Sequence, residues 1–184
     1  MPKFLSLPRI LASIALAALL MQPALAQSDD DWTRLLETYV IESADGLNRV
    51  DYEALAGNEA DRAALDAYIA GFETRDLSTT GDAEFAAWAN LYNAVTVRHI
   101  LERYPLDSIR DGYVFGGPWK KVSVSVGGDD VSLDAIEHDI LRPRFKDPRV
   151  HYAINCASYG CPNLAIRAWT ADTLDEDLDA ATRA

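Results

Sequence analysis

The segment DAEFAAWANLYNAVTVRHILERY, residues 82–104, is the longest periodic stretch of this 184-residue chain and predicts a helix. Pro105 should end the helix, because proline cannot continue the hydrogen-bond ladder. Apolar residues surround almost the whole helix, which indicates that it is buried. Buried amides need specific partners, so Asn90 and Asn93 are expected to be hydrogen-bonded. His99 falls on an apolar stripe of the helix and is expected to be a core histidine.

Shorter elements are expected on both sides of this central helix. Helical spacing or capping signals predict further helices at 31–43, 59–72, 132–141 and from Thr170 onward. Extended segments are expected at 50–52, 121–126, about 131 and 150–156, with a turn at 127–130 and a helix stop at 142–143. The order predicts an α+β fold, in which N-terminal helices and a long buried central helix pack on a small antiparallel sheet with flanking helices.

The charge balance limits the kind of partner. Asp and Glu number 29 against 17 Lys and Arg, which gives a formal net charge of -12. Such an acidic chain is not expected to bind nucleic acid phosphates or anionic lipid. The expected partner is an unidentified small molecule or peptide.

The amino terminus is typical of a secretory signal peptide. Lys3 and Arg9 precede the apolar run 10–20, and the small-residue site Ala24-Leu25-Ala26 follows. The run is about half of the ~20 residues needed to cross a bilayer, so cleavage after Ala26 without a membrane anchor is expected. We therefore expect a signal peptide at 1–26 and one exported domain at 27–184, periplasmic or extracellular. The final expected helix has no stop signal before Ala184, which is consistent with a fragment.

Two cysteines lie in the string NCASYGCP, residues 155–162. In an oxidising compartment, Cys156 and Cys161 are disulfide candidates, because the turn-like residues between them allow Cα atoms to approach within about 5.5 Å. Alternatively, Cys156 is a nucleophile whose proton His138 removes. The spacing of cysteines and histidines does not fit a zinc site, and no cofactor motif occurs, so neither metal nor cofactor is expected.

Two polar groups are candidates for ligand binding. If residues 150–156 form a strand, His151 and Asn155 face away from Cys156, towards Asn90 and Asn93. This His/Asn cluster either holds a ligand or is a network within the core.

The second group is the locally basic run that contains Arg142 and Arg144. It is either a solvated face or a site for a carboxylate or phosphate.

Several motifs occur in order between Phe85 and the end of the chain. They are WANLYNA (88–94) with Thr96 and His99, GPW (117–119), SLD (132–134) with Glu137 and His138, LRPRF (141–145), NCAS (155–158) and CP (161–162). Together they resemble the domain of unknown function 547 family. The resemblance implies an α+β domain, found in exported bacterial proteins and in intracellular plant and animal proteins, with no settled activity. It also weakens the argument that the cysteine pair is only an export-compartment bridge, because intracellular relatives often retain a similar pair.

Two hypotheses about function remain. The first, narrowly favoured, is an exported binding or structural domain in which the His/Asn cluster, with Arg142 and Arg144, holds a ligand or the fold. The second is a thiol-dependent hydrolase or acyl transferase that uses Cys156 and His138. The order of elements is loosely similar to transglutaminase-like and papain-like folds, although the central helix here carries no cysteine. Whether the protein is an enzyme is left open.

Overall fold

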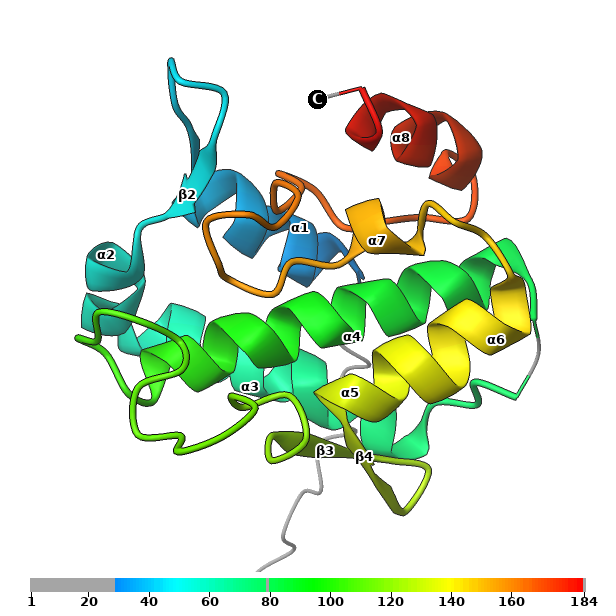
Figure 1. Cartoon of the computed structure of the whole chain (residues 1–184), viewed down its shortest axis with the longest axis horizontal. Coiled ribbons are helices and arrows are strands. Elements are labelled where there is room, and N and C mark those ends of the chain that lie inside the picture. Colours follow the sequence, from blue (N-terminus) through cyan, green and yellow to red (C-terminus); the bar gives the residue numbers. More distant parts are fainter. Residues whose placement is uncertain (1–28, 79, 184) are drawn as a thin grey trace, which may run out of the picture.

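Helix α4 (Asp82–Leu101) crosses the middle of the computed structural model, which describes residues 29–78 and 80–183 (Figure 1). Every residue from Glu84 to Val97 is buried, which confirms the prediction of a buried central helix. The helix ends three residues before the predicted end at Tyr104. Proline disfavours helical backbone angles in the residue that precedes it, so the helix ends before Tyr104 and not at Pro105.

The N-terminal part of the described chain begins with a helix and a small hairpin. Helix α1 (Asp29–Tyr39) leads into strand β1 (Val40–Glu42), which pairs antiparallel with β2 (Asn48–Val50). The prediction of a helix to residue 43 is therefore wrong at its end, because the β-branched pair Val40 and Ile41 joins a strand instead.

The segment after β2 contains a helix that the sequence interpretation missed. Helix α2 (Tyr52–Gly57) begins where an extended link was expected, and the Asp51 side chain caps it by accepting from the Ala54 N–H. Helix α3 (Glu59–Ala70) and the 3₁₀ turn η1 (Gly71–Thr74) confirm the helix predicted at 59–72.

A second hairpin lies against η1, on the side of the molecule away from helix α8 (Leu174–Ala181) (Figure 1). Strands β3 (Ser123–Val126) and β4 (Asp129–Ser132) pair antiparallel through a Gly127-Gly128 turn, as predicted. Both glycines have positive φ angles, 60° and 89°, which two-residue hairpin turns of this kind require. The molecule thus combines helices with two small antiparallel sheets, which confirms the α+β class.

The helix after β4 is longer than predicted. Ser132 caps it as expected, and α5 (Leu133–Ala135), the π-helical η2 (Ile136–Leu141) and α6 (Arg142–Phe145) follow without a break. A stop at Arg142-Pro143 is therefore wrong. The π-helical segment places Pro143 in the first turn of α6, where its missing N–H costs little.

The predicted strand at 150–156 is wrong. Residues Val150–Ala153 form the helical turn α7, and only from Ile154 does the chain become extended. Val150 and Ala153 face the core at a spacing of three residues, so the apolar pattern fits one helical turn as well as a strand. The assignment of His151 and Cys156 to opposite faces of a strand therefore does not hold.

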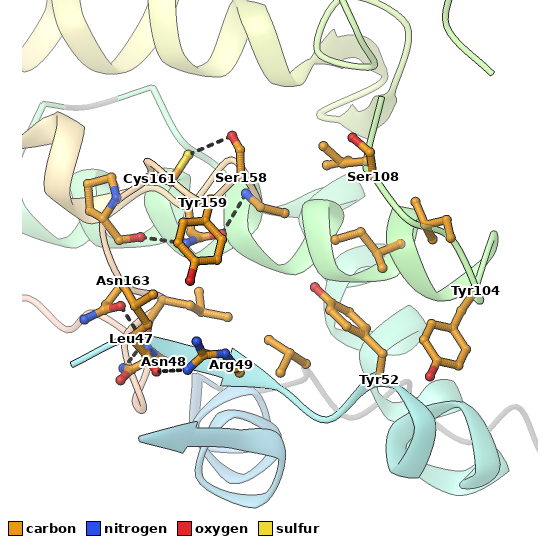
Figure 2. Close-up of a pocket in the computed structure, with 18 of the residues that line it drawn as sticks. Leu47, Asn48, Arg49, Tyr52, Tyr104, Ser108, Ser158, Tyr159, Cys161 and Asn163 are labelled. Atoms are coloured by element: carbon orange, nitrogen blue, oxygen red, sulfur yellow. Dashed lines mark hydrogen bonds between the residues drawn. The ribbon is translucent and has the colours of Figure 1, made fainter. Parts of the chain in front are cut away.

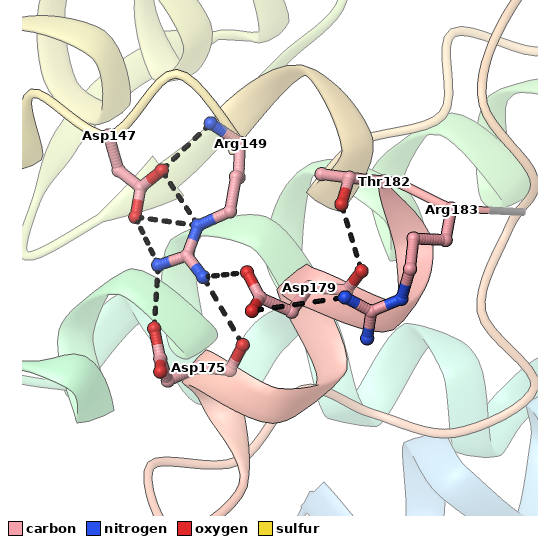
Figure 3. Close-up of polar contacts among 6 residues, drawn as sticks. All are labelled: Asp147, Arg149, Asp175, Asp179, Thr182 and Arg183. Carbon is pink, nitrogen blue, oxygen red and sulfur yellow. Dashed lines mark hydrogen bonds and ion pairs between the residues drawn. The ribbon is translucent and has the colours of Figure 1, made fainter.

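Helix α8 (Leu174–Ala181) buries Leu174 and Leu178, as predicted, although it begins after Thr173 rather than at Thr170. Arg149, just before α7, holds this helix in place (Figure 3). Its guanidinium donates to one carboxylate beside it in the chain and to two on α8, namely Asp147, Asp175 and Asp179. Within the described residues, no helix is both long enough and apolar enough to span a membrane.

Candidate functional site

The two buried amides of α4 hold the C-terminal segment against the helix. Asn90 makes a pair of 2.9 Å hydrogen bonds with the backbone of Trp169, donating to its carbonyl and accepting from its N–H. Asn93 donates to the Ala153 carbonyl and accepts from the Asn155 N–H. This confirms that both amides have specific partners. It also means that α4 positions the loop that carries the cysteines.

That loop, residues 155–162, closes on itself. The Asn155 side chain donates to the Pro162 carbonyl at 2.6 Å and accepts from the Ala157 N–H at 2.8 Å. A disulfide joins Cys156 to Cys161, whose Cα atoms are 6.0 Å apart. The pair proposed from the sequence is thus bridged in the structure.

The disulfide connects the walls of two cavities. Cys156 lines a cavity of about 420 Å³, called here the His138 cavity, whose polar lining includes Tyr92, Trp119, Lys120, Lys121, Glu137 and His138. Cys161 lines another of about 400 Å³, called here the Tyr52 cavity, together with Asn48, Arg49, Tyr52, Tyr104, Ser108 and Asn155. The cysteine bridge therefore lies between two spaces of ligand size.

Two hydrogen-bond donors of the His138 cavity have no partner among the described residues. They are the Tyr92 hydroxyl and the Trp119 indole N–H. Tyr92 is only 1% exposed. Burial, helped by the negative charge of Glu137, raises the pKa of Tyr92, so its hydroxyl stays protonated and remains a donor. The Trp119 indole N–H lies close enough to the Tyr92 hydroxyl to lower its pKa slightly against this rise. The two groups make no hydrogen bond of good geometry.

A glycine keeps the Trp119 ring in place. Gly117 has a φ of +75°, and a Cβ added there would overlap the ring of Trp119. The sequence motif Gly117-Pro118-Trp119 thus has a packing reason, because the indole lies directly against the glycine backbone.

Charged side chains at the edge of the cavity are partly paired. Arg142 donates to Glu137 through Nε at 3.1 Å and Nη2 at 2.6 Å, and His138 Nε2 lies 3.9 Å from the same carboxylate oxygen. Lys120 lies 3.9 Å from Asp134 and is largely exposed. The cavity therefore combines buried neutral donors with cations that reach solvent.

The Tyr52 cavity is more open and has tyrosines at both ends. Tyr52 stacks on Tyr104 with ring centroids 6.3 Å apart, opposite the end that carries Cys161 and Tyr159 (Figure 2). Arg49 makes two hydrogen bonds to the Asp45 carboxylate. Its cation is thus already paired, and no buried unpartnered donor faces this cavity among the described residues.

The structure brings together some of the site residues expected from the sequence. His138 and Cys156 line one cavity, and the Asn155 backbone is bonded to Asn93. The other candidates do not join this group. His151 is exposed on α7 and packs on Tyr152. Arg142 pairs with Glu137, and Arg144 donates to the Leu77 carbonyl. His99 is buried in the core, with Nε2 3.2 Å from the Tyr113 hydroxyl.

Two residues of the His138 cavity were missed by sequence reasoning. Tyr92 sits in the apolar pattern of the central helix, and nothing in that pattern shows whether its hydroxyl finds a partner. Trp119 was noted only as part of a motif. No group of three or more His, Cys, Asp or Glu side chains suited to a metal ion occurs in the described part of the chain.

Comparison with known proteins gives one match. No curated protein and no solved structure matches the chain. The family model described as "Protein of unknown function, DUF547" matches residues 77–184, which is more than half of the chain and includes α4, both cysteines and His138. The chain therefore belongs to the DUF547 family, as its motifs had indicated.

Proposed function

We propose that the protein binds a small molecule or short peptide in the His138 cavity, through a carbonyl or carboxylate oxygen of the ligand. One observation carries this proposal, namely that two donors on residues that line this cavity, the Tyr92 hydroxyl and the Trp119 indole N–H, are buried and make no hydrogen bond of good geometry within the described residues. A buried donor without an acceptor costs about 1–3 kcal/mol, so its retention calls for an acceptor from outside the protein.

The charges around the cavity favour a carboxylate over a neutral carbonyl. Lys120 and Lys121 line the cavity together with the carboxylates of Asp134 and Glu137, and Arg142 pairs with Glu137, so these five charges leave a positive balance. We also propose that binding takes place outside the cytoplasm. The signal-like residues 1–26, which lie outside the described residues, and the disulfide both support export.

The test separates binding from folding by removing one hydroxyl. Tyr92→Phe deletes a group that has no protein partner, so the free energy of unfolding should stay the same or rise. Tyr68→Phe is the matched control, because the Tyr68 hydroxyl donates to Asp29 at 2.9 Å and its loss should cost about 1 kcal/mol.

Binding is followed through the Trp119 indole N–H resonance, assigned with Trp119→Phe. Titration with acetate, N-acetylglycine and neutral N-acetylglycinamide should shift this resonance, most strongly with the two carboxylates. Tyr92→Phe should weaken binding about tenfold, which corresponds to ~1.4 kcal/mol, and Tyr68→Phe should not change it. A resonance that no probe shifts, or unchanged affinity in Tyr92→Phe, would contradict the proposal.

A second candidate function is thiol-dependent acyl transfer. It is favoured by one observation, which is that Cys156 and His138 line the same cavity. After reduction of the bridge, His138 would take the thiol proton and the Cys156 thiolate would attack a carbonyl carbon of the substrate. The bond from that carbon to the leaving group would then break, and His138 would return the proton to the leaving group. Water or an acceptor nucleophile would next attack the acyl-thioester and release the Cys156 thiol. Tyr92 and Trp119 would donate to the oxyanion.

The acyl-transfer candidate has its own test. Intact mass with and without reductant establishes the bridge, and p-nitrophenyl acetate then reports acyl transfer by the reduced protein. A burst of p-nitrophenol that disappears in both Cys156→Ser and His138→Gln supports this candidate. Equal rates for the reduced protein and Cys156→Ser exclude it.

A further inference from the structure

We infer that the Cys156–Cys161 disulfide is a redox site, which takes two electrons from a substrate dithiol, and not a support of the fold. This chemistry uses the two sulfur atoms alone, so it depends neither on the ligand proposed for the His138 cavity nor on acyl transfer. Four features of the loop lead to it, namely hydrogen bonds that make the bridge redundant, access to both sulfurs, a hydroxyl between them, and nearby cations.

The loop is closed without the disulfide. The hydrogen bond from Asn155 Nδ2 to the Pro162 carbonyl joins the residues that directly flank the two cysteines. Asn93 holds one end of the loop by accepting from the Asn155 N–H. At the other end, Asn163 donates to the Gly46 carbonyl and accepts from the Asn48 N–H. Because the bridge spans only five positions in sequence, it adds little chain entropy to this closure.

Both sulfur-bearing residues can be approached, and from different spaces. Cys156 and Cys161 are each partly exposed, and the intervening Ser158 and Tyr159 are exposed. Cys161 lies at the wall of the Tyr52 cavity beside Ser158 (Figure 2), whereas Cys156 lines the His138 cavity. A thiolate attacks a disulfide in line with the bond that breaks. A nucleophile in the Tyr52 cavity would therefore attack Cys161 and drive the Cys156 sulfur towards the His138 cavity.

The surroundings favour Cys156 as the leaving thiolate. Ser158 Oγ lies 3.4 Å from Cys156 Sγ and 3.6 Å from Cys161 Sγ, so its hydroxyl can donate to a thiolate on either sulfur. Lys120 and Lys121 line the same cavity as Cys156, and positive charge around a sulfur stabilises a departing thiolate. Two carboxylates oppose this effect there, those of Asp134 and Glu137, but Glu137 is paired with Arg142.

The exchange balances in two steps. A substrate thiolate attacks Cys161 Sγ, the Sγ–Sγ bond breaks, and Cys156 leaves as a thiolate with the bonding electron pair. The second thiol of the substrate, after losing its proton, then attacks the substrate sulfur of the mixed disulfide and releases Cys161 as a thiolate. The substrate becomes a disulfide, and the protein gains two electrons and, once its thiolates are protonated, two protons.

The experiment measures reduction and folding separately on the oxidised full chain. Dithiothreitol serves as the dithiol probe, and alkylation followed by intact mass counts the free thiols over time. Reduction should be complete in low millimolar dithiothreitol without denaturant, and the melting temperature of the reduced protein should fall by only a few degrees. A bridge that is reduced only after unfolding, or a reduced chain that does not stay folded, would overturn the inference.

Two further measurements test the assigned roles. Brief exposure to glutathione, followed by acid quenching and peptide mapping, should place glutathione on Cys161. Ser158→Ala should slow reduction several-fold, whereas Ser108→Ala, which changes another serine of the Tyr52 cavity, should not. Glutathione found mainly on Cys156 would refute the proposed direction of attack. Equal reduction rates in Ser158→Ala and the unmodified protein would refute the role assigned to the Ser158 hydroxyl.

Discussion

Replacing Asn90 tests how the C-terminal segment is held on the central helix. Its side chain is 0% exposed and makes two hydrogen bonds to the backbone of Trp169. Asn90→Ala removes both and leaves the Trp169 N–H and carbonyl without these partners. At about 1–3 kcal/mol for each unsatisfied group, the free energy of unfolding should fall by about 2–6 kcal/mol. That is a large part of the ~5–15 kcal/mol that stabilises a typical domain.

Asn93→Ala provides a comparison within the same helix. Asn93 also makes two hydrogen bonds, but one of its partners, the Ala153 carbonyl, accepts a second hydrogen bond from Trp169 Nε1 at 3.0 Å. Only the Asn155 N–H therefore loses its partner. The expected loss is smaller, about 1–3 kcal/mol, so this variant stays measurable if Asn90→Ala does not fold.

Asn90→Asp adds a test with a defined sign. The new side chain can accept from the Trp169 N–H, but only its protonated form can donate to the Trp169 carbonyl. Burial and this hydrogen bond both raise the pKa of the aspartate in the folded state above its value in the unfolded chain. The folded state then binds more protons, so Asn90→Asp should gain stability relative to Asn90→Ala as the pH falls from 8 to 5.

Urea unfolding followed by tryptophan fluorescence measures all three variants at each pH. The reasoning fails if Asn90→Ala costs less than ~1 kcal/mol, if it costs less than Asn93→Ala, or if the stability of Asn90→Asp relative to Asn90→Ala is independent of pH.

Three other predictions concern pH, an ion-pair cluster and a glycine. Burial, with nearby arginine charges, lowers the pKa of His99 below its ordinary value of 6.5, so the unfolded chain binds this proton more readily. The free energy of unfolding should therefore fall as the pH drops below about 6.5, and His99→Gln should show less of this fall in urea titrations. Arg149→Met removes hydrogen bonds to three carboxylates, two of them largely exposed. The free energy of unfolding should fall by about 1–2 kcal/mol, and amide exchange in α8 should become faster. Unchanged exchange in α8 would contradict the role assigned to Arg149. Gly116 and Gly117 share a φ of +75°, but only at Gly117 would a Cβ overlap Trp119. Gly116→Ala should thus cost ~1 kcal/mol, and Gly117→Ala should cost more and also shift the Trp119 indole resonance.

The sequence by itself determined the central helix, the need of Asn90 and Asn93 for partners, the β3–β4 hairpin and the family. These follow from periodicity, proline and glycine signals, and motif order, all of which act within a short stretch of chain. The sequence also identified Cys156, Cys161 and His138 as candidate reactive residues.

Only the tertiary structure decided what surrounds those residues. The segment that begins at Val150 has an apolar pattern that fits both a strand and a helical turn, and its packing on α4 selects the turn. In the same way, no local signal shows that the Tyr92 hydroxyl is buried without a hydrogen-bond partner, because the satisfaction of a donor depends on residues far away in the chain. The convergence of Tyr92, Trp119, His138 and Cys156 on one cavity therefore emerged only from the folded chain.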